Sequence, residues 1–125
     1  MNQALNAIRT YERSLTTVRS QKAIEYEVIS RISHRLRMAS LRRHENFPDF
    51  VGALSENRRL WTLLAADVAQ PENSLPQDLR SRLFWLAEFV NEETRIVLRG
   101  RGDVASLIEI NAMIMKGLRG QEGNS

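Results

Sequence analysis

Apolar residues recur every three or four positions along most of this 125-residue chain, and its three prolines are the main interruptions of that pattern. Such spacing places side chains on one face of an α-helix. Pro48, Pro71 and Pro76 all stand where a helix would begin or end. Val, Thr and aromatic residues never alternate with polar ones over the length of a strand. The sequence therefore predicts an all-α protein.

Five helices are expected from the apolar periodicity and its breaks. They cover residues 2–13, a stretch from a cap at Thr17 or Ser20 to about residue 43, residues 48–70, a stretch from a cap at Ser74 to residue 99 with Pro76 inside its first turn, and residues 104–119. Ser74 and Gln77 have the spacing of a capping box, Gly100 suits a helix C-terminus, and Asp103 suits the cap of the last helix. Because the links between consecutive helices are short, we expect a compact antiparallel helical bundle.

Length and composition favour one domain without covalent cross-links. We expect a single helical domain over residues 1–120 and a polar, flexible tail over residues 121–125. The absence of Cys excludes disulfides and thiolate chemistry. The first residues lack the pattern of a signal peptide, and no segment approaches the roughly 18 apolar residues of a membrane span. We therefore expect a cytoplasmic protein that does not bind a membrane.

Charge is unevenly distributed along the chain. Residues 1–44 carry nine basic and three acidic side chains, a net charge of +6, whereas residues 45–99 carry six basic and nine acidic ones, a net charge of −3. The basic first third would either attract an acidic partner such as nucleic acid or face the acidic middle of its own fold. Arg31, Arg35 and Arg42 line one edge of the second predicted helix. No aromatic residues are interleaved with them, so we favour a solvated edge over a platform for RNA bases.

The sequence shows no arrangement of residues typical of a catalytic or cofactor site. It has neither a Gly-rich phosphate loop nor a His-Glu-x-x-His pair, and no Ser lies in a nucleophile-elbow motif. A metal site would have to use His34, His44 and carboxylates, and we expect neither a metal nor a cofactor. Glu92 and Glu93 point about 100° apart on a helix and do not share a site. We therefore expect an interaction protein and not an enzyme.

The fourth predicted helix carries two apolar stripes. The first contains Leu79, Leu83, Leu86, Val90 and Val97. Trp85, Phe89 and Ile96 form a second stripe roughly 90–100° around the helix, and Phe84 projects elsewhere. A helix with two apolar faces is either central in its bundle or presents one face to a partner. In the second case Trp85 and Phe89 would anchor an amphipathic helix of another protein, and the same stripe would also suit a homodimer.

Polar side chains interrupt two of the apolar faces. Asn57 lies within the apolar face of the third predicted helix and Asn111 within that of the fifth. Because a buried amide without a partner costs about 1–3 kcal/mol, we expect each Asn to bond a backbone carbonyl, a loop or the other Asn. Such a satisfied amide would fix the register of the helices. Glu25 is similarly placed on the second helix, and Arg58 is its candidate partner.

Several motifs occur in order along the chain at the spacing of one known family. They are Ala53–Trp61 (ALSENRRLW), Asp67, Pro71–Pro76 (PENSLP), Leu79-Arg80, Leu107–Asn111 (LIEIN) and Ile114–Leu118 (IMKGL). Over residues 17–119 the chain resembles the flagellar biosynthesis regulators of the FlaF family. The resemblance implies a small helical cytoplasmic protein of flagellated alphaproteobacteria that acts in flagellin production.

Family membership of this kind implies two possible activities and two protein partners. Members act either as a secretion chaperone that binds flagellin or as a post-transcriptional regulator of flagellin synthesis, and they are linked to a companion regulator, FlbT. For this chain the leading hypothesis is a flagellin-binding chaperone and regulator. The alternatives are a regulator that contacts flagellin mRNA or FlbT through its basic first third, and an adaptor that pairs with FlbT alone.

The family motifs mark seven positions that we expect to build the fold, and one that we expect at the surface. The seven are Asn57, Arg58, Leu60, Trp61, Asn73, Pro76 and Asn111. Arg59 lies away from the apolar stripe of its helix, so it is a candidate for contact with a partner. The residues that we expect to bind a partner are thus Arg59 together with Trp85, Phe89 and Ile96.

Overall fold

Four helices make up the described part of the chain, which in this computed structural model comprises residues 21–123, with side chains described for residues 26–117. They are α2 (Gln21–Leu41), α3 (Phe47–Val68), α4 (Gln77–Leu98) and α5 (Val104–Gly123). No strand occurs among these residues, so the predicted all-α fold is confirmed. The helix predicted over residues 2–13 lies outside the described residues.

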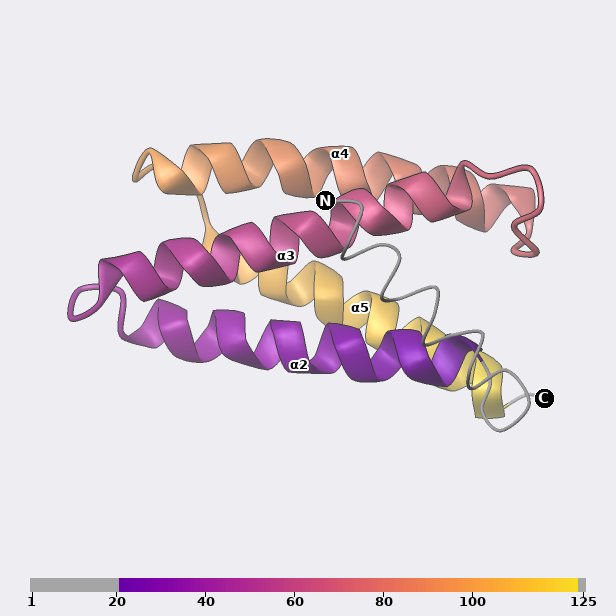
Figure 1. The fold of residues 1–125 in the computed structure, drawn as a ribbon, viewed down its shortest axis with the longest axis horizontal. Helices are drawn as coiled ribbons and strands as arrows, with labels where there is room; N and C mark the ends of the chain where they lie inside the picture. The colour runs from indigo at the N-terminus through magenta and orange to yellow at the C-terminus, as the bar shows by residue number, and fades with distance from the viewer. Residues whose placement is uncertain (1–20, 124–125) are drawn as a thin grey trace.

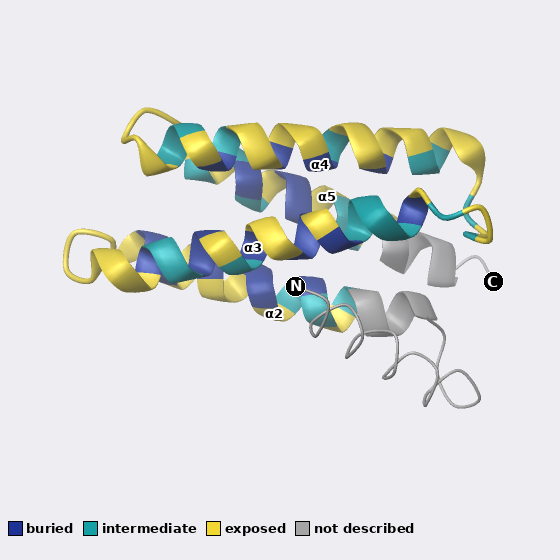
Figure 2. Ribbon diagram, turned by 45° about the horizontal axis from the view of Figure 1, so that its top comes forward, coloured by how far each residue is buried: buried dark blue, intermediate teal, exposed yellow. Residues whose placement is uncertain are grey.

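The four helices close into a ring in which α2 and α4 each contact both α3 and α5. Figure 1 shows α3 between α2 and α4 in the view, with α5 passing behind them. Short links join consecutive helices, which therefore run in opposite directions. Buried residues lie on the inner side of each helix and exposed residues on the outer side (Figure 2). The predicted antiparallel bundle is confirmed for these helices.

The core fills the space that the four helices enclose. Its buried members are Leu36, Ala39, Phe50, Ala53, Leu54, Trp61, Val68, Leu83, Ala87, Val90, Leu107 and Ile110. A second cluster of Ile29, Ile32 and Leu60 joins α2 to α3. Ile29 is only 1% exposed, because it packs in that cluster. Each large side chain buried in this way contributes about 1.5–3 kcal/mol of transfer free energy.

A chain of hydrogen bonds crosses the core between α3 and α5. Trp61 Nε1 donates to Asn111 Oδ1 over 2.8 Å, and Asn111 Nδ2 donates to Asn57 Oδ1 over 2.7 Å. All three side chains are buried, and Asn57 Nδ2 is buried without a hydrogen-bond partner in the described part of the chain. Of the three kinds of partner that the sequence left open for these amides, the structure shows the other Asn. The bonds fix the height at which α5 lies along α3, because sliding either helix would leave buried polar atoms unpaired.

The link between α4 and α5 is fixed by backbone geometry. Gly100 adopts a φ of 82°, a left-handed conformation that glycine tolerates without strain. Its N–H donates to the Val97 carbonyl, and the Arg101 N–H donates to the Ile96 carbonyl, which completes a Schellman motif. The predicted C-terminal role of Gly100 is thus confirmed.

The N-terminus of α5 is capped as the sequence predicts. Asp103 Oδ1 accepts a hydrogen bond from the Ala105 N–H over 2.9 Å. The Asp103 N–H in turn donates to Glu93 Oε2 of α4 over 2.7 Å. Two consecutive helices are therefore joined by a side chain as well as by the backbone of their link.

The predicted capping box at the start of α4 is wrong. Ser74 does not cap the helix, because α4 begins at Gln77 directly after Pro76 and no side chain bonds its first N–H groups. The link is held instead by Asn73, whose Nδ2 donates to the backbone oxygen of Asp67 over 3.2 Å. Spacing alone could not distinguish these alternatives, because Asn and Ser both compete for backbone groups in turns.

Other helix boundaries differ from the expectations by a few residues. α2 ends at Leu41 instead of near residue 43, and α3 begins at Phe47, with Asn46 Oδ1 accepting from the Asp49 N–H. α5 continues to Gly123, so the segment predicted as a flexible tail, residues 121–125, begins as helix. A weakly amphipathic final turn can extend a helix without a sequence signal that marks its end.

Gly102 provides a test of the α4–α5 link. A Cβ at Gly102 would lie 2.6 Å from Val97 Cγ2 and 2.7 Å from the Val97 backbone nitrogen. We expect Gly102→Ala to lower the free energy of unfolding by about 1–3 kcal/mol, because backbone atoms would have to move. Gly117→Ala is the matched control: nothing lies within 4 Å of its Cβ, so it should gain up to about 1 kcal/mol in the helix. Urea titration followed by circular dichroism measures both, and equal effects would contradict this account.

The buried amides yield a second prediction, an order of stability between two variants. Asn111→Leu leaves both Trp61 Nε1 and the Asn57 amide unpaired, at about 1–3 kcal/mol for each group. Asn57→Leu leaves only Asn111 Nδ2 unpaired and removes the Nδ2 that already lacks a partner, so its loss should be the smaller one. Urea titration of both variants checks the order. A larger loss for Asn57→Leu would show that Asn111 is not the central member.

Candidate functional site

α4 has one buried and one solvent-exposed face. Leu83, Ala87 and Val90 are buried against the rest of the bundle. Trp85 is 64% exposed and Phe89 38% exposed, on the outer side of the same helix. α4 is therefore not central in its bundle, and the alternative that the sequence left open is decided in favour of an outer face. Whether a partner binds there remains a prediction.

Trp85 and Phe89 form a stacked pair, called here the aromatic surface. Their ring centroids lie 6.3 Å apart at an interplanar angle of 23°. Residues four apart on a helix are neighbours, so α4 itself holds the two rings together. Ile96, the third member of the predicted stripe, is only half-buried and lies nearly two turns further along. Pre-stacked rings lose less conformational entropy when a partner covers them than free side chains would.

Other exposed apolar side chains are scattered over the molecule. Met38, Leu41 and Met113 are exposed on α2 and α5. Phe47 makes a ring contact with Phe50, but the second ring of that pair is buried in the core. Single exposed apolar residues are normal on a protein surface. Among the described residues, Trp85 and Phe89 thus make the one ring contact in which both rings are exposed.

A hollow of about 560 Å³ lies on the seam between α3 and α4. From α3 it is lined by Ser55, Arg58, Arg59, Thr62 and Ala65, and from α4 by Ala87, Glu88 and Asn91. Arg58 Nε donates to Asn91 Oδ1 across the hollow. The expected partner of Arg58, Glu25, lies outside the described side chains. Arg59 is exposed and forms no hydrogen bond or ion pair with any residue that the structure describes.

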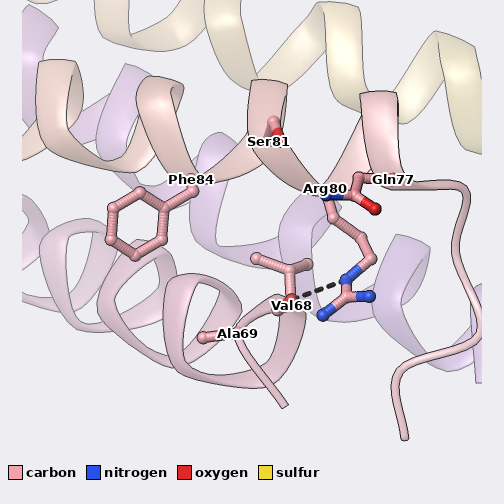
Figure 3. A pocket seen from close by; sticks show the side chains of 6 residues that line it. All are labelled: Val68, Ala69, Gln77, Arg80, Ser81 and Phe84. Carbon is pink, nitrogen blue, oxygen red and sulfur yellow. Dashed lines mark hydrogen bonds between the residues drawn. The ribbon is translucent and has the colours of Figure 1, made fainter. Parts of the chain in front are cut away.

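A second hollow of about 310 Å³ follows on the same seam, and it is drawn in Figure 3. Val68 and Ala69 line it from the end of α3, and Phe84 and Arg80 line it from α4 (Figure 3). Arg80 Nε donates to the Val68 carbonyl over 2.8 Å and its Nη2 to the Gln70 carbonyl over 2.9 Å. The guanidinium thus caps the C-terminal carbonyls of α3, where the helix dipole favours a cation.

Phe84 is the site residue that the sequence analysis missed. It is 45% exposed and projects over the α3–α4 seam, whereas periodicity alone showed only that it leaves both stripes. The three- and four-residue spacing from Gln77 through Arg80 and Phe84 to Ala87 was a usable signal. This spacing identifies Phe84 as part of the α3–α4 seam only when the position of α3 is known.

The motif residues expected to build the fold have partners within the chain. Asn57, Trp61 and Asn111 form the buried hydrogen bonds of the core, and Leu60 packs in the cluster between α2 and α3. Asn73 and Pro76 lie in the link before α4, and Arg58 bonds across the seam to that helix. Arg59 is the motif residue whose side chain faces solvent without such a partner among the described residues.

The three arginines of the predicted basic edge on α2 differ in their surroundings. Arg35 bonds Glu56 Oε1 over 3.1 Å and Asp49 Oδ1 over 3.2 Å, both on α3. These hydrogen bonds, the one to Glu56 first, raise the pKa of Arg35 above its ordinary value. Arg31 and Arg42 are exposed. The basic edge therefore partly faces acidic residues of its own fold, which is one of the two alternatives that the charge distribution allowed.

Two other kinds of feature were considered over the described residues. No described helix combines the length and the apolar character that crossing a bilayer requires. Within residues 21–123 no three His, Asp or Glu side chains come together in a way that could hold a metal ion. The aromatic surface and the two hollows on the α3–α4 seam are the surface features that bear on binding.

Comparison with known proteins identifies one family. The family model described as flagellar protein FlaF matches residues 7–118, which is most of the chain and includes α2, α3 and α4 completely. Comparison with curated proteins and with solved structures gave no significant match. The family resemblance expected over residues 17–119 is therefore confirmed.

Substitution of the exposed indole should separate surface from core. We expect Trp85→Ala to change the free energy of unfolding by no more than about 0.5 kcal/mol and to leave the far-UV circular dichroism spectrum unchanged, because this side chain is 64% exposed. Trp61→Ala should cost about 3–5 kcal/mol, because that indole is 1% exposed and bonded. Global unfolding of the Trp85 variant would show that the aromatic surface is part of the core.

Proposed function

This chain belongs to the FlaF family of flagellar proteins, and from that premise we propose that it binds flagellin in the cytoplasm as a secretion chaperone and thereby regulates flagellin synthesis or export. The proposal names a protein–protein interaction as the whole activity, without catalysis. The flagellar assignment rests on the family, and the choice of flagellin rests on the resemblance described above. The structure contributes a surface on which such binding would occur.

The aromatic surface is the observation that supports the proposal most strongly. Trp85 and Phe89 lie stacked and exposed on a helix whose opposite face already supplies the core. Soluble monomers rarely expose contiguous apolar patches, and such patches often mark interaction sites. Trp is among the residues most often found as an energetic anchor at interfaces. An apolar helix face that covers this pair would remove apolar surface from water. This burial favours binding by about 25 cal/mol for each Å² of apolar area.

A chaperone of this type would act by covering a helix of its substrate. An export substrate with amphipathic terminal helices exposes apolar faces before assembly, and such faces bind in a helix-lined groove. Trp85 and Phe89 would meet that face, and Arg59 would contact polar groups at its edge. Binding would also couple export to synthesis, because flagellin held by the chaperone is removed from the free pool.

The alternative activity, contact with flagellin mRNA through the basic first third, gains less support. Arg35, one of the three arginines invoked for it, is bonded to Asp49 and Glu56. Arg31 and Arg42 remain exposed, and attraction of RNA by charge alone would be strongly dependent on salt. If FlbT is the partner instead, a complex of this chain with FlbT should form without flagellin.

Co-expression with flagellin tests the proposal. We expect a stoichiometric complex in size-exclusion chromatography with light scattering, and a loss of at least tenfold in affinity for Trp85→Ala, since a central aromatic anchor is worth about 2 kcal/mol or more. Met113→Ala is the matched control, because Met113 is 59% exposed on α5 and lies outside the aromatic surface. It should bind flagellin like the unaltered protein.

Three outcomes would count against flagellin binding at this surface. A complex that survives Trp85→Ala unchanged would remove the aromatic surface from the interface. Binding of flagellin mRNA that is lost on charge reversal of Arg31, Arg35 and Arg42 would favour the regulator of translation. A stable complex with FlbT and none with flagellin would favour the adaptor.

A further inference from the structure

The two hollows on the α3–α4 seam lie in line on one face of the molecule. On α3 the residues that line them, single or in adjacent pairs, recur every three or four positions from Ser55 to Ala69, and on α4 they do so from Gln77 to Asn91. Such intervals trace a single stripe along a helix. At 1.5 Å per residue, each stripe is roughly 21 Å long, which is about four helical turns. We call this combined surface the α3–α4 furrow.

Small side chains give the α3–α4 furrow its depth. Ala65 of α3 and Ala87 of α4 line the larger hollow, and Ala87 is only 6% exposed. Helices that meet through alanines approach closely and leave room above the contact. Phe84 lies one helical turn before Ala87 on α4 and adds an apolar surface to the smaller hollow. The middle of the α3–α4 furrow is thus apolar, with the exposed Phe84 ring as an accessible part of it.

Positive charge dominates the sides of the α3–α4 furrow. Arg58, Arg59 and Arg80 line it, and Glu88 is the one acidic residue among the lining residues. Arg80 is committed to the carbonyls at the end of α3, and Arg58 bonds Asn91 through Nε. Arg59 is exposed without a partner in the described chain. The cations available to a ligand therefore cluster on the α3 side, at the end of the furrow near Ser55.

We propose that the α3–α4 furrow binds one acidic amphipathic helix of about four turns, with its aliphatic face on Phe84 and Ala87 and its carboxylates beside Arg58 and Arg59. The length matches the stripe, the apolar middle matches an aliphatic face, and the cations select acidic neighbours. The inference rests on the proposed function, because it gives the chemistry of a helix that flagellin would supply.

A helix suits the α3–α4 furrow better than a nucleic acid does. Single-stranded RNA binds where several aromatic rings offer stacking surfaces along a basic groove. Here Phe84 is the one aromatic residue that lines the furrow, and Arg58 and Arg59, the cations not committed to the carbonyls at the end of α3, both lie on its α3 side. An α-helix, in contrast, presents apolar and acidic groups on adjacent faces, in the same arrangement as the apolar middle and the basic side.

Two synthetic helices would test the charge preference with the full-length protein. Both would be hydrocarbon-stapled peptides of about 15 residues with the same leucine face, one carrying Glu and the other Lys on its polar edges. We expect the Glu helix to bind at least tenfold more tightly, and Arg59→Glu to remove that preference. Arg37→Glu is the matched control, because Arg37 is exposed on α2, outside the furrow, and reverses the same charge.

The outcomes separate this inference from the proposed function. Equal binding of the two helices, or equal effects of Arg59→Glu and Arg37→Glu, would overturn the inference, even if flagellin bound in a manner that depends on Trp85. Preference for the Glu helix without any flagellin complex would keep the inference and reject flagellin as the partner. A single-stranded RNA of similar charge is the third probe, and tighter binding of that RNA than of the Glu helix would also overturn it.

Discussion

Asn111 accepts a hydrogen bond from Trp61 and donates one to Asn57, and the arrangement of the bundle depends on these two bonds. They are the polar contacts through which α5 meets α3 across the enclosed core. Apolar packing alone tolerates a helix sliding by a turn, since one aliphatic side chain can replace another. Buried polar atoms do not tolerate it, because each unpaired group costs about 1–3 kcal/mol. The network therefore converts a general helical collapse into one register.

The position of α3 then decides which surfaces remain open. α3 packs on α2 through Leu60 and on α5 through Trp61, and α4 covers its remaining inner side with Leu83, Ala87 and Val90. Because α4 uses that face for the core, its opposite face keeps Trp85 and Phe89 in solvent. Because Ala65 and Ala87 are small, the α3–α4 furrow stays open along the seam between these helices. The candidate interface is thus a consequence of how the core is filled.

Much of the fold could be predicted from the apolar periodicity of the sequence and from the local preferences of single residues. The helical class, the placement of Asn57 and Asn111 on apolar helix faces, the turn at Gly100 and the cap at Asp103 all follow from spacing or from the backbone preferences of single residues. The start of α4 could not, because Ser74 and Asn73 are adjacent residues that both favour turns; no side chain caps the helix, and Asn73 holds the link before it. Phe84 was missed for a different reason: its surroundings belong to another helix.

The sequence by itself determined that this chain forms helices with apolar faces, that two amides on those faces require hydrogen-bond partners, and which family motifs it carries. These properties depend on residues within a few turns of each other, or on identities that need no coordinates. Only the tertiary structure decided that Trp85 and Phe89 face solvent, that Arg35 is bound to α3, and that Arg58, Arg59 and Phe84 share one furrow. Exposure and neighbourhood are properties of two helices at once, and the periodicity of one helix cannot specify where its partner packs.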